Sequence, residues 1–265
     1  MKLGIWASIG LFSVGCVGTT GGDIVDFQAA ASGPKGAIAG QPLRFDTARG
    51  WHVELTTARM HIGAMYLSDY SPPSGSQITS CILPGSYVAQ VIEGRDIDLL
   101  SGKSQLFPVL GHGTALEALS AQVWLTGGDV NEPNDPPQPT VVLQLAGSAQ
   151  DGSTTRSFTA QLTIANNRIS GTGTVAGADP ICTERIVSPI PTSLQIESSG
   201  ALLLRIDPRL LFTNVDFGAL TQQNADKSYA FSDDPSATDQ PSVNLYDNLK
   251  QAGPLYAFSW LRSLN

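Results

Sequence analysis

Trp51-His-Val-Glu-Leu-Thr56 alternates apolar and polar side chains, and Ser157-Phe-Thr-Ala-Gln-Leu-Thr-Ile164 repeats that pattern over eight residues. Apolar side chains at every second position fall on one face of a β-strand, because successive side chains point to opposite faces of a sheet. Each stretch is therefore expected to form a strand that buries one face in a core and leaves the other face in water.

Similar short stretches recur along the chain, and Gly or Pro separates most of them. With the two stretches above, the predicted strands cover residues 24–30, 43–47, 51–56, 60–67, 87–92, 121–125, 141–147, 157–164, 169–175, 194–197, 201–206 and 256–260. Many short strands separated by turn residues are typical of all-β domains. We therefore predict an antiparallel β-sandwich, immunoglobulin-like or jelly-roll-like, with one short C-terminal helix.

Helical signals are few. Asp207-Pro208 has the form of an N-cap followed by Pro at the first helical position, and predicts a short turn through Phe212. Residues 242–252 have an apolar face, with Gly253-Pro254 after it to end the helix, and are the predicted C-terminal helix. Residues 114–121 are a weaker helical candidate, and Asn166-Asn167 predicts a hairpin turn.

The first sixteen residues have the order of a secretory leader. Met1-Lys2 is basic, residues 3–14 are uncharged and mostly apolar, and Gly15 precedes Cys16. Ser13-Val-Gly-Cys16 is similar to the site at which a lipoprotein signal peptidase cleaves before a lipidated Cys. We predict a signal peptide over residues 1–16, a lipid on Cys16 that anchors the chain to a membrane, a flexible tether over 17–22 and a single β-sandwich domain over 23–265. Secretion without a lipid is the alternative.

The composition limits the classes of partner. Hydrophobic residues make up 42% of the chain and charged residues only 14%, which suits a folded domain with a sizeable core. The net charge is −8 and Lys and Arg do not cluster. An acidic surface repels phosphate backbones, so nucleic-acid binding is not expected.

Three cysteines fit an oxidising compartment. If Cys16 carries lipid, Cys81 and Cys182 remain as an even pair in turn-rich surroundings. A disulfide between them would close a loop of about 100 residues, which stabilises a fold by roughly 4–5 kcal/mol in the chain-entropy model. Two buried free thiols are the alternative.

The histidines and methionines concentrate in one region. His52, Met60, His61 and Met65 fall within fourteen residues, and the remaining histidine, His112, lies in a predicted loop. With a short turn between residues 56 and 60, His52 would lie beside His61, and alternation would place Met65 on the face of His61. Imidazole and thioether ligands suit copper, because soft thioethers hold Cu(I). We therefore expect His52, His61, His112 and Met65 as a candidate copper site; ordinary surface histidines and core methionines are the alternative.

Two segments carry a family resemblance. The first runs from Leu43-Arg-Phe-Asp-Thr47 through Trp51-His-Val-Glu-Leu55 to Tyr66-Leu-Ser-Asp69, and the second covers Leu202–Phe217, with the closing Tyr256-Ala-Phe-Ser-Trp260. Together they resemble the MbnP-like family of exported bacterial proteins. The resemblance implies a β-sandwich linked to copper binding through histidines and, in some members, an oxidised Trp near the metal; Trp51, next to His52, is the position to examine.

No motif of an enzyme is evident: the chain has no Gly-x-Ser-x-Gly, His-Glu-x-x-His or Cys-x-x-Cys, and no phosphate-binding loop. We therefore expect a non-enzymatic binding protein of the periplasm or outer membrane, with copper as the candidate cofactor. The alternative is a surface carbohydrate-binding or protein-interaction module without metal, in which Tyr70, Trp124 and Tyr229 would stack on sugar rings.

Overall fold

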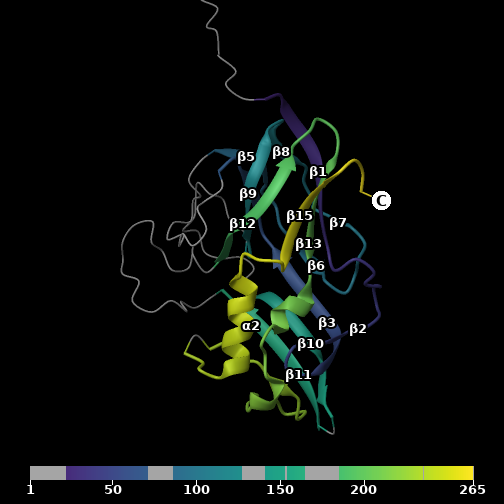
Figure 1. Ribbon diagram of the computed structural model, residues 1–265, viewed down its shortest axis with the longest axis vertical. Coiled ribbons are helices and arrows are strands. Elements are labelled where there is room, and N and C mark those ends of the chain that lie inside the picture. The colour runs from purple at the N-terminus through teal and green to yellow at the C-terminus, as the bar shows by residue number, and fades with distance from the viewer. Residues whose placement is uncertain are drawn as a thin grey trace, which may run out of the picture.

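The computed structural model describes residues 22–70, 86–126, 141–152, 154–164, 185–234 and 236–264. Strands dominate these ranges, and they form two sheets (Figure 1). The predicted all-β class with one short helix near the C-terminus is confirmed. None of the helices in these ranges has the length and apolar character needed to cross a lipid bilayer.

The larger sheet has nine strands within the described residues. Eight run in the order β12 (Ile186–Gln195), β9 (Glu117–Trp124), β4 (Met65–Ser68), β5 (Tyr87–Val91), β8 (Gly111–Thr114), β1 (Ile24–Ser32), β13 (Ala201–Ile206) and β15 (Tyr256–Leu261), and β7 (Gln105–Leu106) also pairs with β1. The two outermost strands, β12 and β15, lie next to each other, so the sheet curls round toward closure (Figure 1). Pro189 and Pro191 fit the edge position of β12, because a Pro cannot donate a backbone hydrogen bond to a further strand.

The smaller sheet has six strands within the described residues. Its order is β14 (Tyr229–Ala230), β11 (Thr154–Thr163), β10 (Val141–Asp151), β3 (His52–Ile62) and β2 (Leu43–Asp46), and β6 (Arg95–Asp98) also pairs with β3. Most pairs in both sheets are antiparallel, as predicted. Two pairs are parallel, β1 with β13 and β11 with β14, so both sheets are mixed.

The inner faces of both sheets contribute to one hydrophobic core. The alternation that predicted the fold places Trp51, Val53 and Leu55 of the β3 region in this core, and Phe158 and Leu162 of β11 lie there too. Their polar neighbours along each strand face outward, as expected for sheets with one buried face.

An Asp side chain caps the start of three short helices, and only the first of these caps, Asp207, was predicted. η1 (Pro208–Phe212) starts after Asp207, whose side chain accepts a hydrogen bond from Arg209 N, and η2 (Phe217–Ala219) starts after Asp216 in the same way. α2 (Gln240–Lys250) begins two residues before the predicted start, because Asp239 is the N-cap and accepts from Ser242 N. Ser242, the first residue of the predicted helix, accepts a hydrogen bond from Ser232 N at 2.8 Å.

Two local predictions are wrong. Residues 114–121 are not helical: most of them belong to β9, which is hydrogen-bonded on both sides by β4 and β12. Residues 57–59 do not form a turn, because β3 runs without interruption from His52 to Ile62. Pairing with neighbouring strands overrides the local pattern in both places.

Candidate functional site

The two histidines expected to meet lie at opposite ends of one strand. His52 is the first residue of β3 and His61 its second-last. At ~3.3 Å per residue, nine positions in an extended strand place the two Cα atoms ~30 Å apart. One metal ion cannot coordinate both rings, so the pairing of His52 with His61 is corrected.

The other two expected ligands also lie elsewhere. His112 belongs to β8 in the larger sheet, where it faces outward. Met65 is fully buried in the core, and the change of strand between Ile62 and Met65 places it on the side opposite to His61. His52, His61, His112 and Met65 therefore do not fit one copper ion, and the described residues contain no group of three or more His, Cys, Asp or Glu placed to hold a metal ion.

All three histidines of the chain instead share another arrangement, which the sequence analysis missed. Each lies directly opposite an Asp of a neighbouring antiparallel strand, and its Nδ1 is hydrogen-bonded to that carboxylate. The pairs are His52 with Asp46, His61 with Asp96 at 2.7 Å, and His112 with Asp26 at 2.5 Å. Cross-strand pairs of this kind are the unit that stabilises a sheet face.

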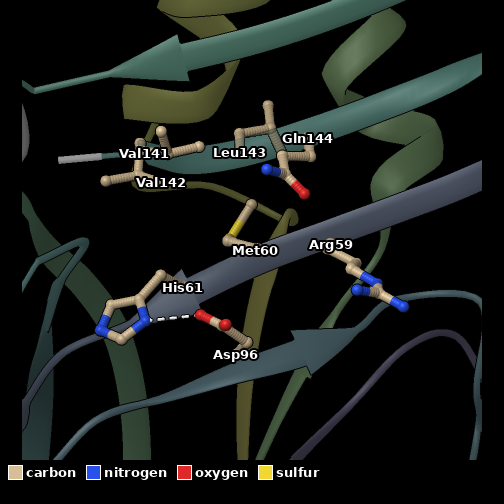
Figure 2. A pocket seen from close by; sticks show the side chains of 8 residues that line it. All are labelled: Arg59, Met60, His61, Asp96, Val141, Val142, Leu143 and Gln144. Atoms are coloured by element: carbon tan, nitrogen blue, oxygen red, sulfur yellow. Dashed lines mark hydrogen bonds and ion pairs between the residues drawn. The ribbon is translucent and has the colours of Figure 1, made fainter. Parts of the chain in front are cut away.

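His61 differs from the other two in its surroundings. Its side chain is only 13% exposed, whereas those of His52 and His112 are 68% and 59% exposed. It lies beside a hollow of about 180 Å³ (Figure 2), which is lined by Arg59, Met60, His61, Asp96, Val141, Val142, Leu143 and Gln144. Of the three histidines, His61 is therefore the one at which a small ligand would also contact other residues that line the hollow.

The hollow lies where the pairing of β3 with β10 ends. The two strands pair as far as Met60 and Leu143, and the pairing of β10 with β11 is irregular between Val141 and Leu143. Beyond Met60, His61 and Ile62 pair with Asp96 and Arg95 of β6 but with no residue of β10. His61 and Asp96 thus border the hollow on one side, and residues 141–144 border it on the other.

The hydrogen bond to Asp96 fixes the chemistry of His61. An ionised carboxylate only accepts hydrogen bonds, so a neutral His61 ring carries its proton on Nδ1 and has a free lone pair on Nε2. Figure 2 shows this second nitrogen turned away from Asp96. A ring oriented by a carboxylate in this way is the usual form of a histidine that binds a metal ion.

Two further polar groups at the hollow are available. Arg59 and Gln144 are direct neighbours across β3 and β10, and neither side chain forms a hydrogen bond or ion pair with another described residue. A guanidinium and an amide are donors for carboxylate or carbonyl oxygens. Together with the His61 ring, these donors can bind a small ligand in the hollow.

The aromatic residues considered for sugar stacking are mostly covered. Trp124 is fully buried between Tyr66 and Arg185. Tyr229 is half-buried beneath the guanidinium of Arg156, 4.4 Å from its ring centre, and Tyr70 is half-buried as well. These three do not form an exposed platform.

Trp51 does not lie beside the His52 ring, because neighbouring residues of an extended segment point to opposite faces. Its side chain enters the core and packs on Phe217, with ring centres 5.7 Å apart, while His52 faces outward.

Cys16, Cys81 and Cys182 lie outside the described residues, so the expected lipid and disulfide remain predictions. The same holds for the strand over 169–175 and the turn at Asn166-Asn167.

Comparison with known proteins gives a distant structural similarity. No family model matches the chain, and no curated protein matches it. Among solved structures, MbnP from Methylosinus trichosporium is similar at 10% sequence identity and a TM-score of 0.41, over 90% of this chain and 98% of that one. This similarity places no ligand in this chain.

Proposed function

We propose that this chain is an exported protein of the cell envelope, held at a membrane by a lipid on Cys16, and that it binds a ligand without converting it. The leader-like residues 1–16 support export. The hollow beside His61, with the donors of Arg59 and Gln144 at its rim, supports a binding role.

The observation that carries this proposal is the His61–Asp96 pair beside the hollow. Asp96 holds the His61 ring through Nδ1 at 2.7 Å, so that Nε2 is the free nitrogen. We propose copper as the ligand, because imidazole nitrogen is a good ligand for it and because the family resemblance implies it. His61 then supplies the protein ligand and water the remaining positions, while His52, His112 and Met65 take no part.

The three histidines provide matched variants for the test. Each of His52→Ala, His61→Ala and His112→Ala removes one Asp-paired imidazole from an outward sheet face, and only His61 lines the hollow. In equilibrium dialysis against Cu(II), the full processed chain is expected to take up about one equivalent. His61→Ala is expected to weaken uptake at least tenfold, and the other two variants to leave it unchanged.

Three results would contradict the metal proposal. Equal weakening in all three variants would show nonspecific surface binding, and unchanged uptake in His61→Ala would remove the hollow from consideration. Failure of the wild-type chain to bind copper favours a metal-free interaction module. Arg59 and Gln144 would then be the residues to replace, because their donors have no partner among the described residues.

A further inference from the structure

The outward face of the larger sheet carries exposed apolar side chains. On strands β1, β7, β8 and β5, or at their ends, four large aliphatic residues are about half or more exposed: Ile24 (85%), Leu110 (50%), Ile92 (48%) and Leu106 (48%). Isolated exposed aliphatic residues are common on soluble proteins, whereas several on one face mark an interaction site.

The strand register places all four on the same face. Leu106 lies opposite Ala30 of β1, and His112 lies opposite both Asp26 of β1 and Gln90 of β5. Alternation from His112 and from Gln90 then turns Leu110 and Ile92 outward. The residues between them point inward: Val91 is in the core, and a side chain on Gly111 would collide with the Phe27 ring. We call Ile24, Ile92, Leu106 and Leu110 the aliphatic face.

The aliphatic face begins where the chain enters the fold. Ile24 is the first residue of β1, and Cys16 precedes it by eight residues. Eight residues reach at most ~28 Å even when fully extended. A lipid on Cys16 therefore keeps this end of β1 close to the bilayer surface.

The charges on this face also bear on its partner. The Asp26 carboxylate is paired with His112, and the other outward positions nearest to it hold Gln28, Gln90 and Thr114. The outward positions around Asp26 carry no Lys or Arg among the described residues, so this end of the face has no cation to attract anionic headgroups. Two arginines lie nearer its other end: Arg95 donates to Leu106 O, and Arg205 lies opposite Ser32 of β1. The outward face of the smaller sheet is also polar, with Gln144, Ser148, Gln150, Ser157 and Gln161. The two faces differ in the four exposed aliphatic side chains of the larger sheet.

We propose that the aliphatic face lies against the headgroup region of the bilayer and contacts zwitterionic lipid, so that the domain rests on the membrane by one defined side. This proposal rests on the lipid anchor of the proposed function. The lipid contact is then made by the larger sheet, whereas the His61 hollow belongs to the smaller sheet. The anchor then orients the protein as well as retaining it.

Hydroxyl-radical footprinting tests this contact, because it reports the solvent exposure of individual aliphatic side chains. The full processed protein is compared on phosphatidylcholine vesicles and, as a Cys16→Ser variant without lipid, in solution. Labelling of Ile24, Ile92, Leu106 and Leu110 is expected to fall at least threefold on vesicles. Val243 on α2, which is 36% exposed, is the control whose labelling should not change.

A double variant, Ile92→Asp with Leu110→Asp, is expected to restore the labelling of Ile24 and Leu106 on vesicles, with folding checked by circular dichroism. Unchanged labelling of the wild-type face, in protein that mass spectrometry shows to be lipidated, would overturn the proposal. Protection that appears in solution as protein concentration rises would also overturn it, because a second copy would then cover the face. Absence of lipid on Cys16 would instead contradict the anchor of the proposed function.

Discussion

His52 and His61 both face outward from β3, although nine positions separate them and strict alternation would place them on opposite faces. An extra residue in β3 resolves this parity. Thr57 lies opposite Ala146 and Leu55 lies opposite Gly147, so Thr56 has no partner of its own in β10. This bulge shifts the buried positions from odd numbers before it to even numbers after it, and thereby places His61 beside Asp96.

Gly147→Ala is expected to disturb this bulge. A Cβ at position 147 would lie 2.2 Å from Glu54 O, a backbone atom that cannot move without shifting β3. Overpacking of this kind costs about 1–3 kcal/mol of unfolding free energy. Urea denaturation measures it. The control is Gly253→Ala, where the nearest atom would be 3.7 Å away, and equal stability of the two variants would show that the close approach is unimportant.

Asp96→Asn is expected to weaken copper binding without removing the proposed ligand. An Asn can no longer hold the His61 ring as a carboxylate does, and loss of such a partner commonly costs 10–100-fold in metal affinity. Asp46→Asn makes the same change next to His52, away from the hollow, and should leave affinity unaltered. Isothermal titration with Cu(II) distinguishes them; a similar loss in both variants would point to overall acidity of the surface.

Tyr256 is expected to make the fold sensitive to alkaline pH. Its hydroxyl is buried and donates to Leu249 O at 2.9 Å, and burial raises the pKa of the phenol well above its usual value. The folded state therefore holds this proton more tightly than the unfolded state, whose Tyr titrates near pH ~10. The stabilisation is complete below pH ~10 and falls above it by up to ~1.4 kcal/mol per pH unit.

Tyr256→Phe isolates this effect. At pH 7 the variant should be less stable by about 1 kcal/mol, because Leu249 O loses its donor. The difference should shrink or reverse by pH 11, because Phe has no proton to lose. Urea denaturation of both proteins at pH 7, 9 and 11 provides the comparison, and a constant difference across that range would contradict the assignment.

The elements that the sequence predicted well are those fixed by local signals. The strand over 201–206 agrees at both ends, and the turn after Asp207 forms as its capping residues indicate. Alternation alone identifies the buried face of Trp51, Val53 and Leu55, because it depends only on which side of the chain meets water.

The elements that it predicted poorly depend on distant partners. The strand β3 continues past Thr56 because β10, some ninety residues later, pairs with Leu55 before it and Thr57 after it. The short strands β6, β7 and β8 likewise form by pairing with β3 or β1.

The predicted grouping of His52, His61, His112 and Met65 around copper fails for the same reason. Asp96 is 35 residues from His61, so no spacing within the chain links them. The sequence could single out His61 by its residue type. It could not identify the carboxylate partner of His61 or show how far His61 lies from His52.

The disulfide expected between Cys81 and Cys182 remains to be tested. Mass spectrometry after alkylation under non-reducing conditions should find both thiols blocked in exported protein. Reduction should then lower the unfolding free energy by up to about 4–5 kcal/mol, since the closed loop is long. A Cys81→Ser, Cys182→Ser double variant should match the reduced protein, and should itself be insensitive to reductant. Full alkylation of unreduced protein would show free thiols instead.

Phe217→Ala is expected to destabilise the fold strongly, because Phe217 lies at the centre of a cluster of aromatic rings in the core. Phe217 is fully buried in η2, and its ring contacts those of Phe158, Phe212 and Phe231 at centre distances of 5.0, 5.5 and 6.0 Å. These rings come from the smaller sheet, from η1 and from the segment before α2, so one side chain joins three parts of the fold.

Truncating a buried Phe costs about 3–5 kcal/mol of unfolding free energy, and Phe217→Leu should cost clearly less because Leu retains most of the side-chain volume. Thermal or urea unfolding of both variants measures the difference, and a loss below about 1 kcal/mol in Phe217→Ala would show that the cluster does not hold these segments together.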